Sequence, residues 1–566
     1  MSTRRDSEAE CDVKSGMSAQ HLEKSSHDVS HESGHVAGNA LLVNKSGEIR
    51  KIPVPSSDPN DPLNFRKWEK YGVVFCCCWF SIMGLSIAAG LGAILSTFFQ
   101  MYIPQGYTPE DVVFLITLPT LCIGLGNFII LPLGLAYGRR PVFLVSMLVL
   151  LAATIAAATQ DSYNGHLVSR VIQGLATGSS ESLLPLMLTE VTFLHERSTI
   201  FGLYWMVQNV LSSIINLASS YLNADLGWRW YYWVFVITVS VGLVIAFFLG
   251  FETQFDRPAS SLDGQLIFTD EFGVTMVVPD DEAQQYLEQL SAAGIDPRDT
   301  SSGRDIPRKS YAERLKPWGK PHPKPLRTMV MSLWQILKSM SSPGIIYAIL
   351  TSSICLGCGV GMSLSYNAVL VENYGWDPAD VGLINVGGAI GAILGMLYST
   401  FLGDPFVLWM ARRNRGVHLP EHHLIVMAPP AVVGVGMLML YGSTASGHAG
   451  TSWWAPYMGW TIFQYSFTAV IIVSTTFAAE VAPKYPGPAL VAVVGTKNIV
   501  SFGVTYGLTP MTAKFGYERA FGILTGIFGA LFLLGIPVYF LNPRWRAAAA
   551  KLESRTKQGQ GTERQD

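Results

Sequence analysis

Two ionisable side chains stand out because each lies inside a long apolar stretch. Glu181 lies within residues 167–189, and Lys497 lies within residues 488–508. A charge at bilayer depth is costly, so such residues mark functional sites by default. Because a low-dielectric cavity favours the neutral carboxyl group, we expect Glu181 to carry a proton. Lys497 is expected to attract an anion or to pair and titrate with a carboxylate. For both residues, a purely structural ion pair or hydrogen bond is the alternative.

Polar residues near these two positions could line a substrate cavity. At 100° per residue, Arg170, Gly174, Gly178 and Glu181 fall on one face of a helix. Gln208, Asn209 and Asn498 lie inside further apolar stretches. We expect Arg170 and these three amides to contact substrate, with interhelical hydrogen bonding as the equal alternative for the amides.

A short basic loop joins two of the apolar stretches and could form a gate. The order Gly-Arg-Arg-Pro predicts a tight turn at Gly138, with the guanidinium groups of Arg139 and Arg140 holding helix ends. Simple anchoring by positive charge is the alternative. A weaker copy follows a later apolar stretch and comprises Asp404, Arg412 and Arg413. We expect both groups to lie at a cytoplasmic gate.

The elements that carry these residues are apolar stretches long enough to cross about 30 Å of hydrocarbon. The chain has 566 residues, of which 49% are hydrophobic and 14% charged, whereas soluble domains carry about 25% charged residues. The predicted spans are 71–97, 111–133, 142–159, 167–189, 199–221, 231–250, 344–366, 381–402, 424–442, 456–478, 488–508 and 521–541. The sequence therefore predicts an all-α membrane protein with twelve transmembrane helices in two groups of six.

Five regions follow from this pattern. Residues 1–70 are predicted to be a disordered tail, 71–250 and 344–541 the two six-helix lobes, 251–343 a polar central loop, and 542–566 a second tail. Only Arg229, Lys514 and Arg519 are basic residues in the loops of one side. By the positive-inside rule, both tails and the central loop are expected in the cytoplasm.

Several function classes are disfavoured by the composition and by missing motifs. The net charge of −2 gives no reason to expect a nucleic-acid partner. The sequence has no Walker A motif, no metal-ligand cluster of useful spacing and no catalytic motif. We therefore expect no ATP, no metal, no cofactor and no enzyme activity. Cys355 and Cys358 are expected to pack as small apolar residues.

Four segments of the chain carry recognisable motifs: Asp58–Phe65 with Trp68, Gly138–Val142, Phe193–Arg197 and Ala411–Val417. Together they resemble the major facilitator superfamily, and more narrowly its fungal branch of twelve-helix drug:proton antiporters and polyamine-type carriers. Two departures from the family pattern are Leu135, where the family usually has an acid, and residues 208–213, which lack the antiporter signature. The first departure predicts that Arg139 and Arg140 close their gate without an acidic partner.

The resemblance implies a secondary transporter that works by alternating access. We expect proton-coupled efflux of a small organic compound, such as a drug, a toxin or a fungal secondary metabolite. Proton-driven uptake of a cationic nutrient such as a polyamine is the alternative, and a non-transporting membrane sensor is the alternative from another class. The expected partners are the substrate, protons and the lipid bilayer, for a monomer in the plasma membrane.

Overall fold

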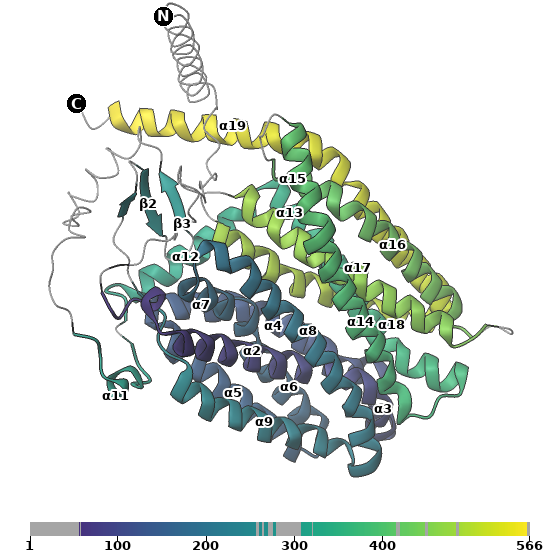
Figure 1. Cartoon of the computed structure of the whole chain (residues 1–566). Helices are drawn as coiled ribbons and strands as arrows, with labels where there is room; N and C mark the ends of the chain where they lie inside the picture. Colours follow the sequence, from purple (N-terminus) through teal and green to yellow (C-terminus); the bar gives the residue numbers. More distant parts are fainter. Residues whose placement is uncertain are drawn as a thin grey trace, which may run out of the picture.

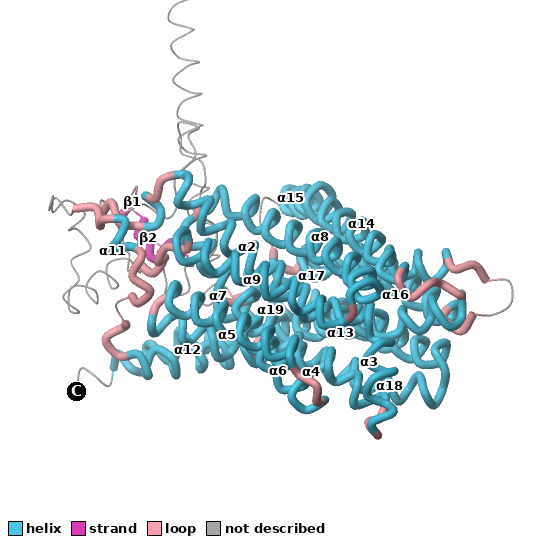
Figure 2. The backbone as a smooth tube through the Cα atoms, turned by 90° about the horizontal axis from the view of Figure 1, so that it is seen from below, coloured by secondary structure: helices cyan, strands magenta, loops and turns pink. Residues whose placement is uncertain are grey.

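The computed structural model describes residues 56, 58–255, 260–262, 265–269, 275–278, 307–319, 321–414, 419–447, 451–482 and 486–562. Helices make up nearly all of this backbone (Figure 2). Ten helical stretches in it are long and apolar enough to cross a membrane. The fourth predicted span is not among the ten because its helix is broken, and the last two lie together within Gly487–Ala548. All twelve predicted spans are therefore helical, and the predicted fold class is confirmed.

The N-terminal lobe contains the first six spans (Figure 1). They are α2 (Lys67–Ala89) with η2 (Gly90–Ile94), α3 (Leu95–Tyr102) and η3 (Ile103–Gln105), then α4 (Pro109–Tyr137), α5 (Arg139–Thr159), α6 (Tyr163–Thr177) with η4 (Gly178–Glu181) and α7 (Leu183–Val191), α8 (Leu194–Leu226) and α9 (Trp228–Leu249). The short η1 (Pro62–Asn64) precedes α2. Regular structure therefore begins before the predicted boundary at residue 71, and most of the predicted N-terminal tail lies outside the described residues.

The C-terminal lobe contains the other six spans. They are α13 (Pro343–Ala368) with η6 (Val369–Asn373), η7 (Asp380–Leu383) with α14 (Ile384–Leu397), η8 (Tyr398–Gly403) and α15 (Asp404–Arg413), then α16 (His422–Thr444), α17 (Trp454–Val481), α18 (Pro486–Leu533) and α19 (Gly535–Thr562). Gly516 has φ 76° and ψ 168°, so it divides α18 into two successive spans. Such a positive φ is easily adopted only by glycine.

The central segment is more structured than a polar loop. It holds the antiparallel strands β1 (Ser260–Leu262), β2 (Gln265–Thr269) and β3 (Thr275–Val278) in the order β1-β2-β3, followed by α11 (Tyr311–Arg314) and α12 (Pro325–Ser339). Figure 1 shows β2, β3 and α12 together at one end of the bundle, which we call the central-segment end. Two arginines of this segment, Arg308 and Arg314, pair with Glu69 of α2 at 2.8 and 2.6 Å.

The predicted C-terminal tail is also helical, because α19 continues to Thr562. The alanines at positions 547–550 and their charged neighbours are strong helix formers. The prediction placed a boundary where the apolar residues end, but helix propensity extends the helix beyond that point.

The two lobes are in contact at both ends of the bundle. At the central-segment end, one apolar cluster joins α4, α7, α12 and α18, and it contains Leu131, Leu135, Leu186, Ile336, Val491 and Ala492. At the opposite end, Asn367 Nδ2 donates a hydrogen bond to the carbonyl of Ala93 at 2.7 Å. Tyr221 donates to Asp380 at 2.8 Å at the same end. The two lobes therefore touch at both ends of the bundle.

Candidate functional site

Glu181 and Lys497 form an ion pair between the two lobes. Lys497 Nζ lies 3.0 Å from Glu181 Oε1, and Asn498 Nδ2 donates to Glu181 Oε2 at 2.6 Å. Glu181 belongs to η4 of the N-terminal lobe, whereas Lys497 and Asn498 belong to α18 of the C-terminal lobe. Their exposed fractions are only 9%, 5% and 3%. The structure thus brings three of the predicted site residues together.

An interruption of the fourth span positions Glu181. α6 ends at Thr177, the next four residues form a 3-10 turn, and Ser182 has φ −124° and ψ −63°. The hydroxyls of Ser179, Ser180 and Ser182 donate to carbonyls three or four residues earlier. Such bonds compete with the regular helix ladder. Discontinuous helices of this kind carry the binding sites of many transporters.

Glycines allow the backbone segments around the ion pair to approach closely. A Cβ atom on Gly178 would lie 2.8 Å from the backbone of Gly126 and Asn127. A Cβ atom on Gly124 would lie 2.7 Å from the carbonyl oxygen of Gly495. α4 therefore packs tightly against η4 in its own lobe and against α18 in the other lobe. Small residues support this packing in membrane proteins.

The ion pair has no net charge, and burial of each charged group is compensated by the presence of the other. Each charge has lost most of its hydration, and the attraction between them compensates only while they are in contact. Separating the lobes at this point would leave a buried carboxylate and a buried ammonium without partners. Separating the two residues would therefore be costly unless one charge is neutralised or another group takes its place.

Two unpartnered acceptors belong to the segments around the pair. Asn127 is fully buried, and its Oδ1 has no hydrogen-bond partner among the described residues, although its Nδ2 donates to Ile123. The hydroxyl oxygen of Thr496, the residue before Lys497, is also without a partner there. Sequence reasoning missed Asn127, although an amide within the apolar span 111–133 was a usable signal. These atoms could accept hydrogen bonds from a bound compound.

The other predicted cavity residues make contacts away from the ion pair. Arg170 is fully buried and donates to the carbonyls of Leu115, Ile87 and Ala88 at 2.8, 2.8 and 3.0 Å. It therefore ties α2, α4 and α6 together within one lobe. Gln208 accepts from Ser81 at 2.6 Å, which joins α8 to α2, whereas Asn209 donates to Trp205 of its own helix.

The turn at Gly138 is tight, as the sequence predicts, with φ 107°. Arg139 binds the carboxylate of Glu190 at 2.8 Å, and its backbone N–H donates to Glu252 at 3.0 Å. The expectation that the arginines act without an acidic partner is therefore wrong. The family usually has an acid at the position of Leu135. Here two acids distant in sequence, Glu190 near the end of α7 and Glu252 just after α9, contact Arg139 instead. Their distance along the chain hid this arrangement from the sequence motif.

Arg140 holds a helix end, as predicted for this loop. Its guanidinium donates to the carbonyls of Gly250 and Phe247 at 2.7 Å each, at the C-terminal end of α9. It also donates to Leu315 of the central segment at 3.1 Å. A cation is favourable at this pole of the helix dipole. The predicted N-terminal gate residues thus connect α5, α7, α9 and the central segment.

The corresponding loop of the C-terminal lobe has different contacts from the loop at Gly138. Asp404 begins α15, while Arg412 and Arg413 lie exposed in its last turn. The third span of this lobe, α16, begins with His422 and His423, and His423 Nε2 lies 3.2 Å from Glu480 at the end of α17. Asp404, Arg412 and Arg413 therefore do not reproduce the contacts that Arg139 and Arg140 make in the N-terminal lobe.

Comparisons with known proteins agree with this architecture. A family model described as Major Facilitator Superfamily matches residues 74–418. An MFS-type transporter of Schizosaccharomyces pombe is 26% identical over 550 residues and covers 92% of each chain. Protein HOL1 of Saccharomyces cerevisiae is 24% identical, covering 91% of this chain and 93% of its own. The efflux pump radE of Floropilus chiversii is 22% identical, covering 90% and 88%.

Among solved structures, the human organic anion transporter MFSD10 superposes with a TM-score of 0.48 at 15% identity, covering 83% of this chain and all of that one. The family match spans more than half of the chain and reaches from the first helix into the second lobe. The family predicted from the sequence motifs is thereby confirmed, and these three sequence relatives are fungal. The chain belongs to the Major Facilitator Superfamily.

Proposed function

We propose that this transporter exports a small organic compound in exchange for protons, with Glu181 as the proton-binding group. The observation that carries the proposal is the buried ion pair between Glu181 and Lys497, which joins the two lobes at 3.0 Å. Rocking of two lobes about a central site is the general basis of alternating access in this type of fold. A titratable contact between the lobes can link that movement to proton binding.

The proposed exchange follows from competition for one carboxylate. The ammonium of Lys497, 3.0 Å away, attracts the carboxylate of Glu181. A substrate that donates hydrogen bonds could bind this carboxylate, with Asn127 Oδ1 and Thr496 Oγ1 as further acceptors. A proton that enters from the acidic side would neutralise the carboxylate and weaken its hold on both Lys497 and the substrate. Because proton and substrate use the same group, the two move in opposite directions.

The site also indicates the chemical class of the substrate. The unpartnered acceptors suit hydroxyl or amine groups, whereas the surrounding glycines and Phe128 offer apolar contact. Net export is supported by the relative named as an efflux pump. Lys497 already neutralises Glu181, which disfavours uptake of a strongly cationic nutrient through this site. A transporting role is also favoured over a sensor because the pair lies at the contact between the lobes, where alternating access would require movement.

The topology and location are part of the proposal. The central-segment end is assigned to the cytoplasm because the basic residues of the loops gather there. Both termini then lie in the cytoplasm, and the expected location is the plasma membrane, with one chain as the working unit.

Transport in sealed inside-out vesicles tests the proposal. A panel of amphipathic compounds with hydroxyl or amine groups is offered under an imposed acid-inside gradient, using wild type, Glu181→Gln and Glu372→Gln. Glu372 is an exposed carboxylate in η6, the turn that follows α13, so its variant is a matched control. Gradient-driven accumulation is expected for wild type and Glu372→Gln and not for Glu181→Gln. Equal gradient-driven accumulation by Glu181→Gln would refute the assignment.

A further inference from the structure

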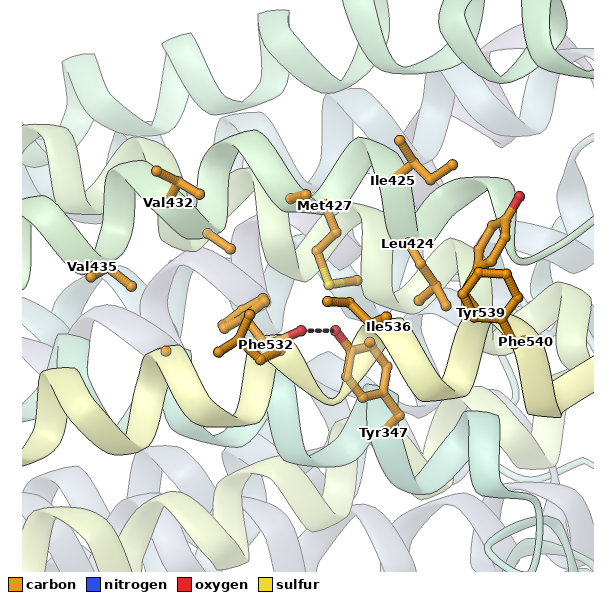
Figure 3. A pocket seen from close by; sticks show the side chains of 15 residues that line it. Tyr347, Leu424, Ile425, Met427, Val432, Val435, Phe532, Ile536, Tyr539 and Phe540 are labelled. Carbon is orange, nitrogen blue, oxygen red and sulfur yellow. Dashed lines mark hydrogen bonds between the residues drawn. The ribbon is translucent and has the colours of Figure 1, made fainter.

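We propose that a groove on the C-terminal lobe binds an anionic phospholipid from the leaflet at the central-segment end. The groove has a volume of about 540 Å³ and lies between α16 and the joined α18 and α19 (Figure 3). Its lining is apolar except for two tyrosine hydroxyls, and that of Tyr347 is already donated to the carbonyl of Phe532 at 3.3 Å. Cavities of this volume suit small-molecule ligands.

The length of the groove is close to the thickness of the hydrocarbon layer of one leaflet. Along α16 its lining extends from Leu424 to Val435 (Figure 3), which at 1.5 Å per residue is about 16 Å. One leaflet of the hydrocarbon core is about 15 Å thick. Since α16 begins at His422 at the central-segment end, the groove occupies the depth of that leaflet.

The groove is concave, so an occupant would contact several walls at once. Met427 and Ala431 are buried in its wall, whereas Val432 is 72% exposed at its rim. Gly529 keeps the space open, because a Cβ atom there would meet only Val435 Cγ2, at 3.7 Å. A lipid chain on a convex helix surface has no such enclosure, so a chain in this groove should be retained more strongly.

An exposed cation, Arg544, lies about one helical turn beyond the groove-lining Phe540 on α19. Residues four positions apart lie on the same side of a helix, so we expect Arg544 on the side of α19 that Phe540 presents to the groove. Arg544 is exposed and has no ion pair among the described residues, whereas the nearby Arg546 pairs with Glu421 at 2.8 Å.

The neighbouring Trp545 is 37% exposed, as expected for an aromatic residue at the membrane interface. An apolar groove that ends at a cation in the interface matches the two parts of an anionic phospholipid. An uncharged compound in the groove would leave this cation without a partner.

Native mass spectrometry of the purified full-length protein in detergent, titrated with phosphatidylglycerol or phosphatidylcholine, tests the proposal. For wild type, the first bound molecule of phosphatidylglycerol should have a lower dissociation constant than the first bound molecule of phosphatidylcholine. Arg544→Gln should weaken the affinity for the first phosphatidylglycerol molecule about fivefold. This ratio corresponds to about 1 kcal/mol, the contribution of one basic residue near anionic lipid. Gly529→Leu, which fills the groove, should weaken both lipids about tenfold or more.

Matched variants separate the groove from general effects. Gly526→Leu adds the same side chain one turn away, where nothing lies within 4 Å of the new Cβ atom. Arg327→Gln removes an exposed charge from α12 at the same end. Both should bind lipid as wild type does. Lipid binding by Gly529→Leu that equals that of Gly526→Leu would overturn the proposal. If wild type instead shows the mass of a dimer and Gly529→Leu does not, the proposal is also overturned, because the occupant of the groove is then a second copy of the chain.

Discussion

A double-mutant cycle on Glu181 and Lys497 probes the strength of the contact between the lobes. Lys497→Met leaves a carboxylate that is 9% exposed and whose one remaining hydrogen bond to a described side chain is that from Asn498. Removing one partner of a buried pair costs about 3–5 kcal/mol, because the remaining charge stays buried without compensation. Glu181→Gln leaves the ammonium of Lys497 unpaired in the same way. Each single variant should therefore be clearly less stable than wild type.

The double variant Glu181→Gln with Lys497→Met should recover much of this loss. Both charges are then absent, and neutral side chains of similar volume often replace a buried pair at little cost. We expect a coupling energy of about 2–3 kcal/mol, at the upper end for residues in contact. The assay is denaturant-induced unfolding of the purified protein in one fixed detergent mixture, followed by tryptophan fluorescence.

A second cycle on an exposed charge pair calibrates the measurement. Arg229 and Asp161 are exposed and form an ion pair at the surface. Their neutral variants should show a coupling energy close to zero, as surface pairs usually do. If the losses of Glu181→Gln and Lys497→Met simply add in the double variant, the two side chains do not interact energetically and the reasoning fails.

Three further predictions concern the gate, the packing and the topology. Arg139→Ala should reduce transport at least tenfold while insertion stays near normal, and Glu190→Gln should do likewise because the two residues pair at 2.8 Å; a drop only in the inserted amount would indicate a topology anchor. Gly126→Leu should abolish transport, since its Cβ would lie 2.3 Å from the Leu175 carbonyl oxygen; retained turnover would contradict this packing. With impermeant thiol reagent on intact cells of a cysteine-free background, Lys514→Cys should label and Lys309→Cys should not; the reverse would invert the topology.

The sequence predicted the elements well because their lengths are imposed by the bilayer. An apolar stretch of about 20 residues has few alternatives to a membrane-spanning helix. The break at residues 178–182 was not predicted, because Gly178, Ser179 and Ser180 are compatible with a continuous helix. It is decided by serine hydroxyl bonds and by close contact with α4.

The site was predicted by residue type but not by pairing. Glu181 and Lys497 were evident as charges within apolar spans, yet they are 316 positions apart, and nothing in their local sequences relates them. Glu190 and Glu252 were missed because they lie at helix ends beside polar loops, where an acid is unremarkable. Only the arrangement of the helices shows that both acids surround Gly138 and Arg139.

The most direct test of the central proposal measures proton movement itself. Purified protein is reconstituted into vesicles that contain a pH-sensitive dye, and a transported compound is added under conditions without an imposed gradient. We expect wild-type protein to move protons opposite to the compound. Glu181→Gln should still bind the compound, as measured by its effect on tryptophan fluorescence, but should move no protons. Proton movement of wild-type size in Glu181→Gln would contradict the assignment of Glu181 as the coupling group.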